Sequence, residues 1–172
     1  MDSFTVPTVT FRVLFVLVVL AHDRRRVIHF NVTEHPTTRW TGQQIVEAFP
    51  WDTAPRYLLR DRDGIYGHNF VRHVDAIGIE QVVIAARSPR QTPYVERIIG
   101  SIRRECLNHV IVFNERHLRR ILSRYFRYHH TVRTHLGPAN DTPLARPVQP
   151  PAMGEVVVLP EVGALHHRYE RR

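Results

Sequence analysis

The chain has 172 residues, enough for one domain with a substantial hydrophobic core. Its formal net charge is +8 and it contains no lysine, so its positive charge comes from arginine, whose forked guanidinium suits phosphate. A protein this basic is expected to bind a polyanion, most simply nucleic acid. The single cysteine, Cys106, excludes an internal disulfide framework and a cysteine-based zinc site, and it favours a reducing cytoplasm.

The longest apolar run, FRVLFVLVVLA at 11–21, is too short to cross a bilayer and contains Arg12. A secretory signal is not expected, because Asp2 stands where a positive start would be and no small-residue cleavage site follows. We therefore expect no membrane association. The run is typical of a fully buried strand. Strands are predicted over 2–6, 12–20 and 25–33.

Helical and extended patterns then alternate, which predicts a mixed α/β domain. Gly78 is expected to stop one helix, and Asn114 to cap another. Half of the twelve prolines lie beyond Gly137, so the chain becomes rich in proline from that point. We accordingly predict a core at 1–137 and a Pro-rich C-terminal extension at 138–172. Further predicted elements are helices at 41–49, 69–78, 94–111 and 115–130, strands at 56–61 and 80–86, and an added strand within 154–165.

The segment LLRDRDGIYG, residues 58–67, places Asp61 and Asp63 at the end of a predicted strand. Asp2 begins the first predicted strand, and Glu96 lies in the first turn of a predicted helix. Carboxylate oxygens are the ligands that Mg²⁺ prefers, and strands and helices hold such ligands rigidly. Spacing alone leaves a second interpretation open, in which these are solvated carboxylates and the aspartate pair is a polar turn.

Four motifs in order resemble the catalytic core of DDE transposases and retroviral-type integrases. SPRQTPYVERIIGSIRRECLNHV, from residue 88, is similar to the segment with the family's glutamate, and LLRDRDGIYG to its second-aspartate strand. DSFTV is similar to the first-aspartate strand, and YHHTVRTHLGPANDTP to the end of the core, through His130, Arg133 and His135. The resemblance covers residues 2 to about 150. It implies a ribonuclease-H-like fold, a mixed five-stranded sheet flanked by helices.

The resemblance also implies a site and an activity. Asp2, Asp61 and Glu96 would be the catalytic residues and would hold two Mg²⁺ or Mn²⁺ ions, with Asp63 secondary. The activity would be DNA nicking and strand transfer in DNA integration by a mobile element. The partners would be transposon ends and target DNA, and the family generally works as a homo-oligomer.

Arginines cluster beside the candidate glutamate, and we predict that they contact DNA phosphates. A solvated helix face is the alternative interpretation. A second basic helix, with arginines from Arg116 to Arg127, could line DNA or face solvent, and the sequence does not decide between them. The predicted DNA-binding residues are Arg87, Arg90, Arg97, Arg103 and Arg104.

The chain departs from the family pattern in three places. Pro93 stands where a glycine is common, Asp2 is only the second residue, and no helix-turn-helix domain precedes the core. These departures are typical of a truncated reading frame or a fragment of a longer transposase. They keep an alternative function open: a catalytically inactive remnant that only binds nucleic acid.

Overall fold

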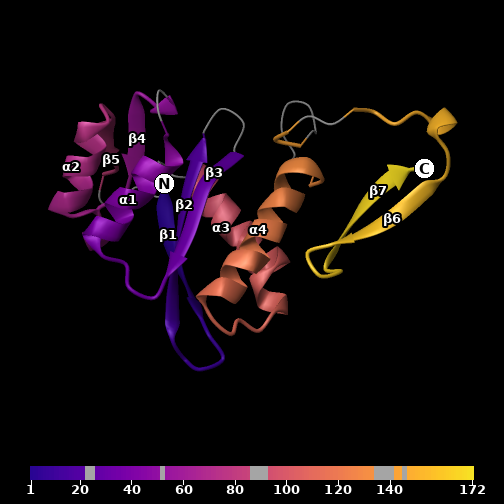
Figure 1. The fold of residues 1–172 in the computed structure, drawn as a ribbon, viewed down its shortest axis with the longest axis horizontal. Coiled ribbons are helices and arrows are strands. Elements are labelled where there is room, and N and C mark those ends of the chain that lie inside the picture. Colours follow the sequence, from indigo (N-terminus) through magenta and orange to yellow (C-terminus); the bar gives the residue numbers. More distant parts are fainter. Residues whose placement is uncertain (22–25, 51–52, 86–92, 134–141, 145–146) are drawn as a thin grey trace.

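The computed structural model describes residues 1–21, 26–50, 53–85, 93–133, 142–144 and 147–172 (Figure 1). A three-stranded antiparallel sheet lies at the centre, with α1 and α2 on one side and α3 and α4 on the other (Figure 1). The helices are α1 Thr38–Ala48, α2 His68–Ala76, α3 Pro93–Glu105 and α4 Glu115–Thr131. The strands are β1 Asp2–Pro7, β2 Val13–Ala21, β3 Arg26–Thr33, β4 Tyr57–Arg60, β5 Glu80–Val83, β6 Val156–Glu161 and β7 His166–Arg171.

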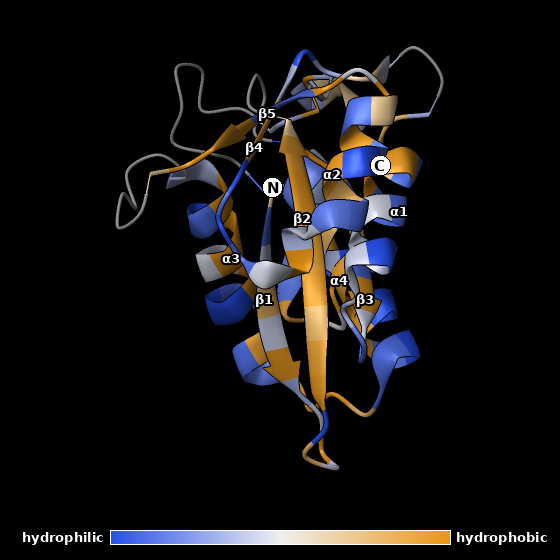
Figure 2. Ribbon diagram, turned by 90° about the vertical axis from the view of Figure 1, so that its left-hand side faces the viewer, coloured by the Kyte–Doolittle hydropathy of each residue, from blue (hydrophilic) through white to orange (hydrophobic). Residues whose placement is uncertain are grey.

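β2 is the middle strand of the central sheet, in the order β1-β2-β3, and is hydrophobic along most of its length (Figure 2). Successive side chains of a strand point to opposite faces. Leu17 and Val19 accordingly pack against α1 and α2, whereas Val16 and Val18 pack against α3 and α4. Because both faces are covered by helices, the strand is apolar without alternation. The sequence prediction of a fully buried strand is confirmed for 16–20, whereas Phe11 and Val13 at the start of the predicted run are exposed.

The sequence predicts one five-stranded sheet, but the described strands form sheets of three, two and two strands. β4 and β5 form a parallel pair, and β6 and β7 form an antiparallel hairpin. The amino group of Met1 donates a hydrogen bond of 2.8 Å to the carbonyl of Leu59 in β4. The contact between β1 and β4 is therefore made by Met1, which directly precedes β1. The residues of β1 itself pair with β2.

Some helix boundaries differ from the predictions. α1 begins at Thr38 rather than at residue 41, because the Thr37 side chain caps it by accepting from the Trp40 N–H at 3.1 Å. α3 ends at Glu105, and a short 3-10 helix at Leu107–His109 takes the place of its predicted last turns. The predicted cap of α4 is confirmed, since Asn114 Oδ1 accepts from the His117 N–H at 2.9 Å.

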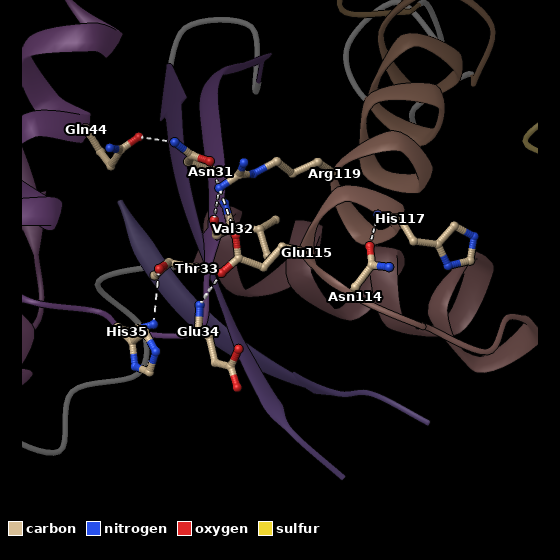
Figure 3. A network of polar contacts seen from close by, with 10 residues as sticks. All are labelled: Asn31, Val32, Thr33, Glu34, His35, Gln44, Asn114, Glu115, His117 and Arg119. Atoms are coloured by element: carbon tan, nitrogen blue, oxygen red, sulfur yellow. Dashed lines mark hydrogen bonds and ion pairs between the residues drawn. The ribbon is translucent and has the colours of Figure 1, made fainter. Parts of the chain in front are cut away.

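α4 also closes the outer edge of the sheet at β3, as Figure 3 shows. The Glu115 carboxylate accepts from the backbone N–H of Glu34 at 2.7 Å. The Arg119 guanidinium donates to the carbonyl of Val32 and pairs with Glu115 at 3.3 Å. Unpaired backbone groups at a sheet edge can pair with another chain. Here side chains of α4 satisfy two of them.

The C-terminal segment, expected to add one strand, forms a two-stranded hairpin whose turn packs on α3 and α4. Val162 in that turn is buried, and the His166 ring stacks on Tyr128 with ring centroids 4.4 Å apart. The imidazole of His166 is 2.8 Å from the Glu105 carbonyl. The division at residue 138 stays a prediction. In the described part of the chain, no helix is long and apolar enough to cross a membrane.

Candidate active site

Asp2 and Asp61 lie where β1 begins and β4 ends, and the contact between Met1 and Leu59 brings these two strand ends together. Each carboxylate accepts a hydrogen bond from a nearby backbone N–H. Asp2 accepts from Ser3 at 2.7 Å, and Asp61 accepts from Asp63 at 3.1 Å. These local bonds orient both carboxylates at one end of the central sheet.

The environment of Asp2 disfavours its negative charge. Burial raises the pKa of Asp2 above its ordinary value of 3.8, and the charges of Asp61 and Glu96 raise it further. The Ser3 N–H and the terminal amino group act in the opposite direction. Asp61 and Glu96 are therefore both close enough to Asp2 to act on its charge, and the structure brings the three predicted carboxylates into one electrostatic neighbourhood.

The amino group of Met1 compensates little of this negative charge. Burial lowers its pKa from 8.0 to about 6, against the attraction of Asp2 and Asp61. At neutral pH the group is therefore mostly uncharged. Within the described ranges, no group of three or more His, Cys, Asp or Glu side chains is close enough to hold a metal ion as it stands.

Glu96 lies in the first turn of α3, as the sequence predicts, and its side chain is exposed. Pro93 is the first helical residue, a position that suits its fixed φ and missing N–H. The buried Val95 and Ile98 anchor this turn in the core under β1 and β2. A negative side chain at a helix N-terminus also interacts favourably with the helix dipole.

Two residues of the site were not singled out from the sequence, Arg60 and Tyr66. The Arg60 guanidinium donates to the carbonyl of Asp61 at 3.0 Å and to Gln81 Oε1 at 2.9 Å. It also lies over the ring of Tyr66, 5.5 Å from the centroid. The available signal was the aromatic residue that follows the aspartates in the motif, but no pattern in the sequence shows how its hydroxyl is placed.

The Tyr66 hydroxyl is buried and has no hydrogen-bond partner within the described structure. Burial raises the pKa of Tyr66 well above 10.0, and the charges of Asp61, Asp2 and Asp63 raise it further. Asp63 itself caps the short 3-10 helix Gly64–Tyr66, because its carboxylate accepts from the Ile65 N–H at 3.2 Å. The secondary role predicted for Asp63 at the metal site stays a prediction.

The predicted DNA-binding arginines are only partly described. Arg87 and Arg90 lie outside the described residues. Arg97, Arg103 and Arg104 are exposed on α3, the helix that carries Glu96. The Arg103 guanidinium also lies over the Phe4 ring, 5.6 Å from its centroid, so this side chain contributes to packing as well as to surface charge.

The motif at the end of the predicted core has structural tasks where the structure describes it. His130 Nε2 accepts from the backbone N–H of Val27 at 3.1 Å. Arg133 donates two hydrogen bonds to Glu105, of 2.8 and 2.6 Å, and the Tyr125 hydroxyl donates to Glu105 at 2.9 Å. The third motif residue, His135, lies outside the described residues. The bonds to Glu105 tie the end of α3 to α4 and to the segment that follows it, and the His130 bond ties α4 to β3.

Comparison with known proteins supports the resemblance that the motifs suggested. Residues 77–143, less than half of the chain, match the family described as the integrase core domain. The chain resembles an integrase core. The matched segment includes Glu96 and Arg133 but neither Asp2 nor Asp61, and no curated protein matches the chain.

A solved structure extends the likeness of fold over the rest of the chain. It is a chain in the cryoEM structure of a simian T-cell lymphotropic virus intasome in complex with PP2A regulatory subunit B56 gamma. The TM-score is 0.65 at 13% sequence identity, over 98% of this chain and 64% of that chain. At this identity the likeness establishes the fold alone. The protein therefore shares its mixed α/β arrangement with that chain but spans 64% of its length.

Proposed function

We propose that this chain is the catalytic core of a DDE-type transposase or integrase that nicks DNA and transfers strands in DNA integration. The observation that carries the proposal is the electrostatic neighbourhood of Asp2, Asp61 and Glu96. Two of these carboxylates lie at neighbouring strand ends and the third in the first turn of a helix. Elements of this kind hold catalytic groups more rigidly than loops do.

The chemistry of the donor set fits divalent cations. Asp2, Asp61 and Glu96 supply only carboxylate oxygens, which Mg²⁺ and Mn²⁺ prefer. The pKa of Asp2 is raised first by burial and then by the charges of Asp61 and Glu96, and a bound cation would favour its ionised form. We propose that these three residues hold two Mg²⁺ or Mn²⁺ ions. When bound, such ions supply Lewis-acid activation of the attacking oxygen and charge stabilisation at the leaving oxygen.

The remaining residues position the carboxylates and the DNA. Arg60 holds the Asp61 carbonyl, and the buried Val95 and Ile98 fix the turn that presents Glu96. Arg97, Arg103 and Arg104 share α3 with Glu96, so they are well placed to contact the phosphates that flank the reacting one. We propose transposon ends and target DNA as the substrates, bound largely through charge, and a homo-oligomer as the working form.

Magnesium-dependent nicking of supercoiled plasmid tests the catalytic proposal. We expect the wild-type chain to nick the plasmid, and Asp61→Asn and Glu96→Gln to abolish nicking because each removes a proposed ligand. Asp63→Asn is the matched control, since asparagine retains the capping of the 3-10 helix, and it should remain active. Nicking that persists in Asp61→Asn would disprove the metal mechanism.

A second candidate is nucleic-acid binding without catalysis. The observation that favours it is that, within the described residues, the three carboxylates are not grouped closely enough to hold a metal ion as they stand. Wild-type protein that binds DNA but never nicks it, at any Mg²⁺ or Mn²⁺ concentration, would support this candidate.

The salt dependence of DNA affinity tests the proposed phosphate contacts. Binding releases counterions, so log K should fall with log salt by roughly 0.9 for each phosphate neutralised. Replacing Arg103 and Arg104 by alanine should weaken binding to all sequences alike and reduce that slope by up to about 2. The matched control replaces Arg120 and Arg124, which are exposed on α4. If only the control changes the slope, α4 contacts the DNA instead of α3.

A further inference from the structure

The hydroxyl of Tyr66 is an unsatisfied buried polar group beside the candidate active site. Tyr66 is only 4% exposed, and its hydroxyl has no hydrogen-bond partner in the described part of the chain. Nearly all buried polar side-chain atoms in proteins have a partner, because burying one without a hydrogen bond is unfavourable. An exception on which the charges of three aspartates act calls for a functional explanation.

The ring of Tyr66 is held on several sides, so its hydroxyl keeps a fixed place. Its backbone N–H donates to the carbonyl of Asp63 at 3.1 Å. Its ring packs on Phe70 at a centroid distance of 5.0 Å, and the Arg60 guanidinium lies over both rings. The same guanidinium is bonded to Gln81 and to the Asp61 carbonyl. The hydroxyl is therefore positioned before any ligand binds.

The Tyr66 hydroxyl is suited to donate a hydrogen bond, so its partner would be a hydrogen-bond acceptor. Burial, and after it the charges of Asp61, Asp2 and Asp63, raise the pKa of Tyr66, so the phenol stays protonated at neutral pH and can donate. Ionised carboxylates only accept hydrogen bonds. Asp61 acts on Tyr66 more strongly than the other two, and one short turn of chain joins the two residues.

We propose that Tyr66 is a positioning residue for the metal site. Its hydroxyl donates a hydrogen bond to the Asp61 carboxylate once a divalent cation is bound there, and this bond orients the carboxylate as a ligand. Carboxylates that bind metals are commonly held by such hydrogen bonds, and losing one typically weakens metal affinity about 10- to 100-fold. The inference rests on the proposed function, because it requires that Asp61 binds a cation.

Tyr125 provides a matched control within the same chain. It is also a buried tyrosine, but its hydroxyl donates to Glu105 at 2.9 Å, in the contact between α3 and α4. Replacing either tyrosine by phenylalanine removes one oxygen and leaves the ring in place. Tyr66→Phe removes a group without a partner, whereas Tyr125→Phe removes a made hydrogen bond. A purely structural role for both tyrosines would leave cation binding unchanged in both variants.

The experiment measures Mn²⁺ affinity, by electron paramagnetic resonance of the free ion, and urea unfolding without cation. Both use the full chain and its Tyr66→Phe, Tyr125→Phe and Asp61→Asn variants. We expect Tyr66→Phe to bind Mn²⁺ about 10- to 100-fold more weakly while its urea midpoint is equal to or higher than that of the wild type. Tyr125→Phe should show the reverse, a lower midpoint with unchanged Mn²⁺ affinity.

The Asp61→Asn variant separates failure of this inference from failure of the proposed function. If Asp61→Asn loses Mn²⁺ binding while Tyr66→Phe binds within twofold of the wild type, the role of Tyr66 is disproved and the metal site stands. If the wild type does not bind Mn²⁺, or Asp61→Asn binds it equally well, both proposals are overturned. A Tyr66→Phe variant with a lower urea midpoint and unchanged Mn²⁺ affinity would assign the hydroxyl to the fold.

Discussion

Two regions of the molecule combine a tyrosine, an arginine and a carboxylate, and they differ in how well these groups satisfy one another. At the end of α3, Glu105 receives two hydrogen bonds from Arg133 and one from Tyr125. In the 3-10 helix that follows β4, the Tyr66 hydroxyl has no hydrogen-bond partner within the described structure, although the charge of Asp61 acts on it. The first region stabilises the fold, and the second keeps unfavourable interactions that a ligand could relieve. Local rules of this kind are usually broken at functional sites.

The largest effect should come from breaking the satisfied region. Arg133→Met keeps most of the side-chain length but leaves the partly buried Glu105 without its charged partner. Removing one member of a buried pair strands the other charge, and because about a quarter of each side chain is exposed we expect a loss of about 2–3 kcal/mol. Urea unfolding at pH 7 measures this loss. Arg116→Met, on the exposed face of α4, is the control and should change stability by less than about 0.5 kcal/mol. Equal effects of the two variants would show that the Glu105 pair adds nothing to the fold.

A smaller effect should appear in the pH dependence of Glu105. Burial alone would raise its pKa, but hydrogen bonds from Arg133 and Tyr125 lower it below its ordinary 4.5. The ionised carboxylate therefore stabilises the fold above pH 4.5, and this contribution disappears as the pH falls through the lowered pKa of the folded state. Wild-type protein should exceed Glu105→Gln in unfolding free energy at pH 7, and the difference should shrink in acid. A difference that grows below pH 4.5 would contradict the assignment.

The smallest effect, opposite in sign, is expected at the unsatisfied region. The raised pKa of Asp2 means that the folded state binds the proton more tightly than the unfolded state. This tighter proton binding contributes fully to the unfolding free energy below pH 3.8, and the contribution is lost as the pH rises through the raised pKa. At pH 7 the ionised Asp2 therefore destabilises the cation-free fold. Asp2→Asn should therefore raise the urea midpoint at pH 7 and have less effect near pH 3. A lower midpoint at pH 7 would show that Asp2 supports the fold.

Much of the fold was accessible from the sequence because its signals are local. The apolar run of β2 requires cover on both faces, and Asn114 satisfies backbone groups of its own helix. The sequence could not predict that the strands form three separate sheets, because this depends on how far β1 and β4 run side by side. β7 was missed because its sequence, HHRYER, is polar and carries no apolar alternation.

In the candidate site, too, local features could be predicted and tertiary contacts could not. Asp61 and Glu96 could be proposed from short motifs, and the structure places both close enough to Asp2 to act on its charge. The roles of Tyr66 and Arg133 could not be predicted, since hydrogen-bond satisfaction depends on groups that are distant in the sequence. Arg133 lies 28 residues from its partner Glu105. Whether a buried tyrosine has a partner is likewise decided by tertiary packing.

The most direct test of the central claim is the effect of Mg²⁺ on the unfolding free energy of the wild type and two variants at pH 7. A ligand that binds only the folded state stabilises it by RT ln(1 + [L]/Kd), so the wild type should gain stability with increasing Mg²⁺. Asp63→Asn should gain as the wild type does, whereas Asp61→Asn should gain nothing. An equal gain in all three proteins, or none in the wild type, would contradict the claim that the carboxylates at the ends of β1 and β4 form a cation site.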